Sequence, residues 1–67
     1  MKDFKGKELH EGDEVVFVLK LDGGKGQIQL SEGVIKQFHA GNAYIQPKDK
    51  DYDWATWGCK GKCIMKL

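Results

Sequence analysis

The sequence predicts an all-β domain built as a small closed barrel, and three observations favour that fold class. Helical periodicity is missing almost everywhere along the 67 residues. Nine glycines divide the chain into short segments of strand length. Residues 13–21 alternate as a strand does, and their apolar side chains fall on both faces, as in a strand of a small barrel. One face carries Val15, Phe17, Leu19 and Leu21, and the other carries Val16 and Val18.

The later elements complete a predicted five-stranded barrel. They are strands over 33–38, 43–46, 54–57 and 63–67, a tight hairpin turn at 39–42, and a single 3₁₀ turn within 58–62, before the last strand. Gly33 predicts a bend or bulge in the second strand, and Pro47 ends the third. The flexible connection 22–26 precedes Ile28 and Leu30, which we expect to pack against the core.

Length and charge limit the function. Residues 1–67 are expected to form one domain whose core is thin, because a chain of this length buries only about 60% of its unfolded surface. A deep catalytic cleft would consume much of that core, so we expect no enzyme and no cofactor. The net charge is +1, and all eleven basic residues are lysine. Without arginine, sequence-specific reading of nucleic acid is disfavoured.

The sequence also indicates a compartment. Residues 1–8 are polar and lack the apolar segment of a signal peptide. No apolar run approaches the ~20 residues that cross a bilayer, so no membrane association is expected. Two cysteines in such a chain are expected to be reduced thiols. These observations predict a cytoplasmic protein.

Three short motifs resemble a known family. Gly12–Phe17 (GDEVVF) resembles the "GD-x-V" entry strand of KOW-type and related SH3-like modules of transcription and translation factors. Gly33–Ile35 is similar to their second strand and Ala43–Ile45 to their third. The resemblance implies a five-stranded SH3-like barrel. It marks a fold that hosts many functions rather than an activity.

The start of the chain resembles small uncharacterised SH3-like proteins of bacteriophages. Asp3-Phe4, Gly6–Leu9 and Gly12-Asp13 carry this likeness, which implies a cytoplasmic location in the host cell. The acidic "ALYDY" segment of eukaryotic SH3 domains is missing, so recognition of proline-rich peptides is not implied. The absence of arginine is a departure from KOW modules that bind RNA.

The aromatic residues supply the candidate partner-binding surface, because Trp and Tyr dominate interface hot spots. They are Tyr44, Tyr52, Trp54 and Trp57. Trp54 and Trp57 have opposite parity on the predicted fourth strand, so one is expected to face the core and the other the solvent. The alternative is that both tryptophans complete the core at the ends of the barrel.

Charged residues offer a second candidate surface. Lys60, Lys62 and Lys66 give the C-terminal ten residues a local charge of +3, and beside aromatic rings they could hold single-stranded nucleic acid. The opposite patch is acidic and could meet a basic protein surface. It consists of Glu8, Glu11, Asp13 and Glu14. The alternative for both patches is that they are solvated faces that keep a small domain soluble.

Cys59 and Cys63 raise the question of a metal. A structural zinc site needs four ligands, and His10 and His39 would have to complete this pair from distant turns. The alternative is a buried Cys63 on the last strand and a Cys59 in a turn. No metal site is therefore predicted, and a zinc-stabilised domain is the weakest hypothesis.

The main hypothesis is a non-catalytic binding module whose partner is a protein, such as a phage-encoded module that alters a host protein. The alternative is a KOW-type nucleic-acid-binding module. Because a barrel of this kind has exposed edge strands, either a monomer or a weak homodimer is expected.

Overall fold

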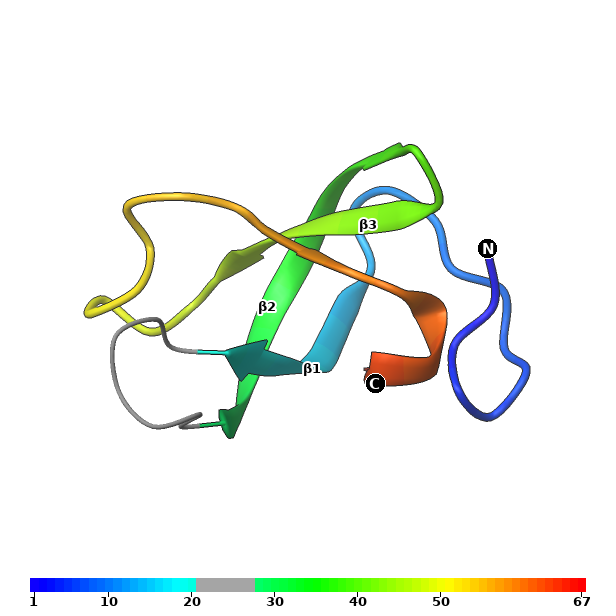
Figure 1. Cartoon of the computed structure of the whole chain (residues 1–67), viewed down its shortest axis with the longest axis horizontal. Helices are drawn as coiled ribbons and strands as arrows, with labels where there is room; N and C mark the ends of the chain where they lie inside the picture. Colours follow the sequence, from blue (N-terminus) through cyan, green and yellow to red (C-terminus); the bar gives the residue numbers. More distant parts are fainter. Residues whose placement is uncertain (21–27) are drawn as a thin grey trace.

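The structure is a computed structural model that describes residues 1–20 and 28–67. These residues form an all-β fold with five antiparallel strands, which confirms the predicted fold class (Figure 1). The strands are β1 (Glu14–Lys20), β2 (Ile28–His39), β3 (Asn42–Pro47), β4 (Trp57–Cys59) and β5 (Ile64–Lys66). In the described residues one 3₁₀ turn, η1 (Gly61–Cys63), directly precedes β5, as predicted.

The strands form one sheet in the order β4-β3-β2-β1-β5, and the sheet is not closed into a barrel over the described residues. It does bend far enough to bring β4 next to β1, where the Cys59 thiol donates to the Val18 carbonyl oxygen at 3.5 Å. Backbone pairing cannot continue there, because β1 already pairs with β2 on one side and β5 on the other. The predicted closure is thus replaced by a side-chain contact.

The core lies on the inner face of the bent sheet. The side chains of β1 divide between two faces as predicted, but only one face is buried. Val15, Phe17 and Leu19 are fully buried, whereas Val16 and Val18, which were predicted to lie on a second buried face, are half-buried on the outer face. The other buried apolar residues are Leu9, Ile35, Ala43, Ile45, Cys59 and Ile64. Burying a side chain such as Phe17 contributes about 1.5–3 kcal/mol, so this small cluster supplies much of the stability.

Gly33 is required by close packing rather than by a bulge. A Cβ atom there would lie 2.6 Å from both the Gln46 carbonyl oxygen and the Ile45 Cγ2 atom. The register shift between β2 and β3 falls at Lys36 instead, between Ile35 and Gln37. Glycine is thus needed at position 33 because there is no space for a side chain, whereas the bulge lies three residues further along the strand.

β2 begins at Ile28 rather than at residue 33, and this earlier start overturns one packing prediction. Leu30 pairs with Val18, so both side chains lie on the outer face, and Leu30 is 74% exposed instead of packed on the core. The side chain of Ile28 and the whole of 21–27, including the predicted flexible connection, lie outside the described residues.

The predicted hairpin turn at 39–42 is present. Its two central residues, Ala40 and Gly41, have φ values of 52° and 81°. Asn42, the last residue of the predicted turn, already belongs to β3. Two consecutive positive φ values suit the twist of a two-residue hairpin, which explains why Ala40 is held in this region.

The fourth strand is displaced from its predicted position. It covers Trp57–Cys59 rather than 54–57, because turn hydrogen bonds hold the preceding segment out of the sheet. Asp49 makes two of them: its side chain accepts from the Asp51 backbone N–H, and its carbonyl accepts from that of Tyr52. An aspartate that bonds to backbone two residues ahead competes with strand formation.

Residues 1–9 cover the outer side of β5. The buried Asp3 carboxylate accepts backbone N–H bonds from Lys5, Lys7 and Lys66 at 2.8–2.9 Å. These hydrogen bonds, of which the one from Lys66 has the largest effect, hold the pKa of Asp3 below its ordinary value. Burial of the carboxyl acts in the opposite direction. Over the part of the chain that is described, no helix is long and apolar enough to span a membrane.

Candidate binding surfaces

The predicted aromatic group divides into two parts. Tyr52, Trp54 and Trp57 lie together at the end of the 48–56 loop, and we call these three residues the aromatic platform. The rings of Trp54 and Trp57 meet edge to face, with centroids 5.5 Å apart and an interplanar angle of 71°. The Trp57 Nε1–H donates to the Tyr52 carbonyl at 3.1 Å. This bond fixes the ring against which Trp54 rests.

The two tryptophans differ in exposure as the sequence predicted. Trp57 is half-buried and packs against the core, whereas Trp54 is 73% exposed. Alternation along a strand is not the cause of this difference, because Trp54 lies in a turn and not on a strand.

Tyr44 is separate from the platform. It pairs with Gly58 across β3 and β4, whereas Trp57 pairs with Ile45, so Tyr44 and Trp57 lie on opposite faces of the sheet. The Tyr44 ring covers Gly58 and approaches His39 at a centroid distance of 6.5 Å. Tyr44 therefore does not extend the surface that Trp54 presents.

The predicted lysine group also divides. The Lys66 Nζ atom lies 3.5 Å from Asp13 Oδ2 and from the Glu8 carbonyl oxygen, so its charge is partly neutralised. Lys60 and Lys62 are exposed, and both line a groove beside β4. Two of the three lysines thus share one surface.

The predicted acidic patch is largely paired within the chain. Glu8 meets the Met1 ammonium at 3.0 Å, which lowers the pKa of the Glu8 carboxyl. Asp13 meets Lys66, and Glu14 meets Lys48 at 3.1 Å. Little unbalanced negative charge remains for a basic partner.

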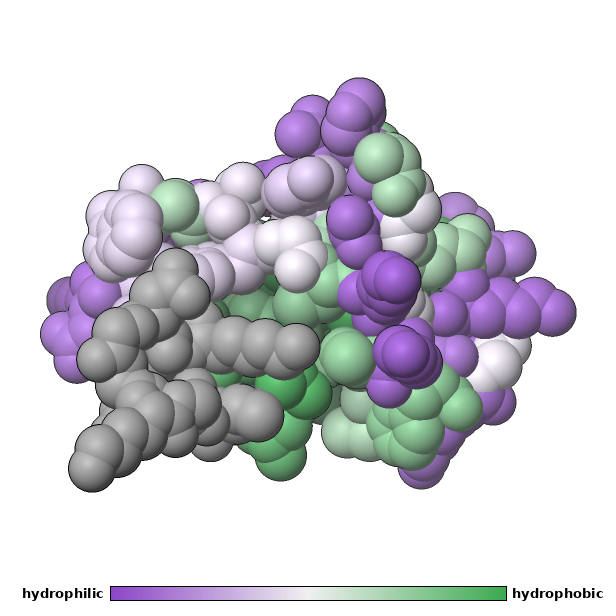
Figure 2. Space-filling view, viewed as in Figure 1, coloured by the Kyte–Doolittle hydropathy of each residue, from purple (hydrophilic) through white to green (hydrophobic). Residues whose placement is uncertain are grey.

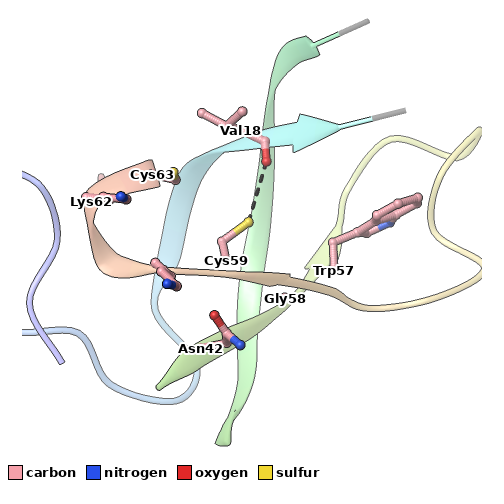
Figure 3. Close-up of a pocket in the computed structure, with 8 residues that line it drawn as sticks. Val18, Asn42, Trp57, Gly58, Cys59, Lys62 and Cys63 are labelled. Carbon is pink, nitrogen blue, oxygen red and sulfur yellow. Dashed lines mark hydrogen bonds between the residues drawn. The ribbon is translucent and has the colours of Figure 1, made fainter. Parts of the chain in front are cut away.

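The groove beside β4 has a volume of about 370 Å³ and opens to solvent (Figure 3). Its walls come from β4, the start of β3, the end of β1 and the η1 turn. The residues that line it are Val18, Asn42, Trp57, Gly58, Cys59, Lys60, Lys62 and Cys63. Trp57 belongs both to this groove and to the aromatic platform, so the two surfaces adjoin.

The cysteines are placed opposite to the predicted alternative. Cys59 is the buried one, on β4, and Cys63 is half-buried in η1 (Figure 3). Both are present as thiols. Among residues 1–20 and 28–67 there is no cluster of three or more His, Cys, Asp or Glu side chains that could hold a metal ion.

A third surface was missed by the sequence analysis. The outer face of β1 and β5 carries an apolar hollow of about 320 Å³. Figure 2 shows apolar surface gathered in the lower part of the view, over β1 and the η1–β5 segment. Its exposed apolar members are Phe4 and Leu30. The apolar residues Val16 and Val18 are its signal in the sequence, but alternation alone predicts a second buried face of a barrel strand for them and not an exposed apolar surface.

The chain was compared with known proteins. No curated protein and no solved structure matches it. One family matches over residues 1–67, and its description is "Domain of unknown function (DUF7205)". Because the match covers the whole sequence, the protein belongs to the DUF7205 family.

Proposed function

We propose that this protein is a non-catalytic binding module that contacts a partner protein through the aromatic platform. The observation that carries the proposal is the position of Trp54. Its side chain is 73% exposed, yet its ring rests against Trp57, which is itself tied to the Tyr52 carbonyl. An exposed aromatic side chain with a defined orientation is the kind of residue that anchors an interface.

The energetics favour binding at such a residue. A ring that is already immobilised loses little conformational entropy when a partner covers it. Trp54 also keeps most of its apolar surface in contact with water, and covering that surface is favourable. The hydrogen bonds at Asp49 and Trp57 already order the loop in the free protein, so binding does not carry the entropic cost of ordering it.

The proposal includes an SH3-like architecture and a phage origin. The sheet order β4-β3-β2-β1-β5 and the η1 turn before β5 support the SH3-like assignment. The motifs at Asp3-Phe4 and Gly12-Asp13 support a likeness to phage proteins. A phage-encoded module of this kind acts in the bacterial cytoplasm, on a protein of the host.

Affinity capture with Trp54→Ala tests the proposal. The wild-type protein, immobilised and exposed to bacterial lysate, is expected to retain at least one protein that the variant does not. Leu30→Ala is the matched control, because Leu30 is 74% exposed on the outer face of β2 and is not part of the aromatic platform. Retention of the same proteins by wild type and Trp54→Ala contradicts the platform as the binding surface. Unfolding in urea verifies that Trp54→Ala stays within about 0.5 kcal/mol of the wild type, as expected for an exposed position.

A nucleic-acid-binding module is the second candidate, and the exposure of Lys60 and Lys62 in one groove favours it. The pairing of Lys66 with Asp13 leaves fewer charges for phosphates. Binding of a single-stranded oligonucleotide should weaken steeply as salt rises. If no binding is detected at low salt, this candidate is excluded.

A further inference from the structure

The outer face of the sheet keeps apolar side chains at its surface around β1 (Figure 2). The hollow on this face is lined by Val16 and Val18 from β1, Leu30 from β2 and Met65 from β5, and Phe4 completes its rim. Leu30 is 74% exposed and Phe4 is 56% exposed. Apolar residues on both faces of a strand are typical of a sheet that is covered on both sides. A second layer over this face would therefore remove apolar surface from water.

The strand registers place one acidic and one basic residue at opposite corners of this face. Glu32 pairs with Val16, so its side chain lies on the same outer face, on the β2 side of β1. Lys62 lies on the β5 side, in the η1 turn, and lines the hollow. Since Ile64 pairs with Phe17, the turn before Ile64 is level with Val18 and not with Val16. Glu32 and Lys62 are thus separated both along β1 and across it.

Both charged side chains are available to a partner. Glu32 and Lys62 are exposed, and within residues 1–20 and 28–67 neither makes an ion pair. Lys48 lies beside the same opening as Glu32, but its ammonium meets Glu14 at 3.1 Å. An apolar face with one unpaired carboxylate and one unpaired ammonium at opposite corners is complementary to a second face of the same kind.

We infer that the protein forms a homodimer through this outer face of β1, β2 and β5. A twofold axis in the plane of the face, perpendicular to the line from Glu32 to Lys62, places Glu32 of each copy opposite Lys62 of the other. Two ion pairs then border the apolar side chains that meet between them. An anionic membrane surface fits less well, because Glu32 would face its headgroups. The inference goes beyond the proposed function, since no residue of the aromatic platform lines the hollow.

The concentration dependence of the mass tests the inference directly. The exposed apolar set is small, so we expect a weak dimer with a dissociation constant on the order of 100 µM. Sedimentation equilibrium from roughly 10 µM to 1 mM should follow a monomer–dimer equilibrium with that constant. Over the same range, the ¹⁵N amide signals of Val16, Val18, Leu30 and Met65 should shift. A single monomeric species at every concentration, or shifts confined to other residues, overturns the inference.

Leu30→Glu places a charge on the inferred interface without disturbing the core. It should weaken dimerisation by about tenfold or more, because the carboxylate would be covered by an apolar surface. Trp54→Glu is the matched control, since Trp54 is 73% exposed, changes the net charge equally and lies outside the hollow. The control should stay within about twofold of the wild type. An equal or larger loss in Trp54→Glu overturns the inference, in favour of a dimer through the platform.

A charge swap tests the relative orientation of the two copies. Glu32→Lys and Lys62→Glu should each weaken dimerisation about tenfold, because by symmetry each sets like charges together at two places. The double variant Glu32→Lys/Lys62→Glu restores opposite charges in reversed order and keeps the net charge of +1. It should dimerise within about threefold of the wild type. A double variant that dimerises no better than the single variants overturns the inference.

Discussion

Two irregular segments flank the sheet, and they use their side chains in opposite ways. Residues 1–9 lie along β5, and residues 48–56 lead into β4. In the first segment Asp3 and Leu9 are buried, at 5% and 3% exposure. In the second, Trp54 is 73% exposed, although turn hydrogen bonds order the chain around it. The first segment completes the fold, whereas the second presents a side chain to solvent.

A defined conformation does not by itself reveal a segment's role. Both segments contain an aspartate that accepts hydrogen bonds from backbone N–H groups, Asp3 in one and Asp49 in the other. They differ in what the ordered backbone supports: a covered strand in one case and an exposed ring in the other. Substitutions in the first should therefore change stability, and substitutions in the second should mainly change binding.

Gly61→Ala should have the largest effect on stability. The added Cβ would overlap the Lys2 carbonyl oxygen, so η1 or residues 1–9 must move. We expect a loss of about 3 kcal/mol in urea unfolding. Gly58→Ala on β4 is the matched control. Its Cβ would approach only the Tyr44 ring, at 3.1 Å, and the loss should be about 1 kcal/mol, the low end of the range for added volume. Similar losses in both variants would contradict the role of residues 1–9 in stabilising the fold.

Asp3→Asn should have the next largest effect, and that effect should depend on pH. The oxygen of the introduced side-chain amide can still accept from the Lys5 and Lys7 backbone N–H groups. Its NH₂ group, however, faces the Lys66 backbone N–H and cannot accept a hydrogen bond from it. Because the pKa of Asp3 is lowered in the folded state, the carboxylate stabilises the fold above the unfolded pKa of about 3.9, and this contribution is lost as pH falls through the folded value. The stability difference between wild type and Asp3→Asn should be full at pH 6 and shrink towards pH 2. A difference that stays constant over this range contradicts the role of the Asp3 carboxylate.

Trp57→Phe should have the smallest effect on stability of the three. It removes the hydrogen bond to the Tyr52 carbonyl and retains an aromatic ring against the core, so a loss of about 1 kcal/mol is expected. Trp54→Phe serves as the control and should change stability by less than about 0.5 kcal/mol. Urea unfolding compares the two. Equal losses would show that Trp54 supports the fold as much as Trp57 does.

The sequence predicted the parts of the fold that depend on alternation. In β1 and β3, alternation along the strand predicted which side chains share a face. Phe17 lies with Val15 and Leu19, Ile45 lies with Ala43, and all five are fully buried. The hairpin turn at 39–42 was also predicted, since a glycine between two strand-like segments indicates a tight turn. These features are set by neighbouring residues, so a single sequence is enough to infer them.

Features that depend on distant residues were not predicted. The Asp3 carboxylate bonds to the Lys66 N–H, and nothing near Asp3 in the sequence indicates that partner. The start of β4 was misplaced because the turns at Asp49 overrode the strand propensity of the aromatic segment. Of the candidate sites, the exposure of one of the two tryptophans was predicted, but the sequence did not tell which one. The groove at Cys59 was not predicted, because it depends on β4 lying next to β1.

The bond between Asp3 and Lys66 also bears on how the protein folds. It joins residues 63 positions apart, so closing it restricts nearly the whole chain and is entropically costly until the strands have assembled. It should therefore form late, after β1 has paired with β5. A nascent or partly folded chain would then expose the outer side of β5, and aggregation through that strand would be confined to the interval before the N-terminal segment docks.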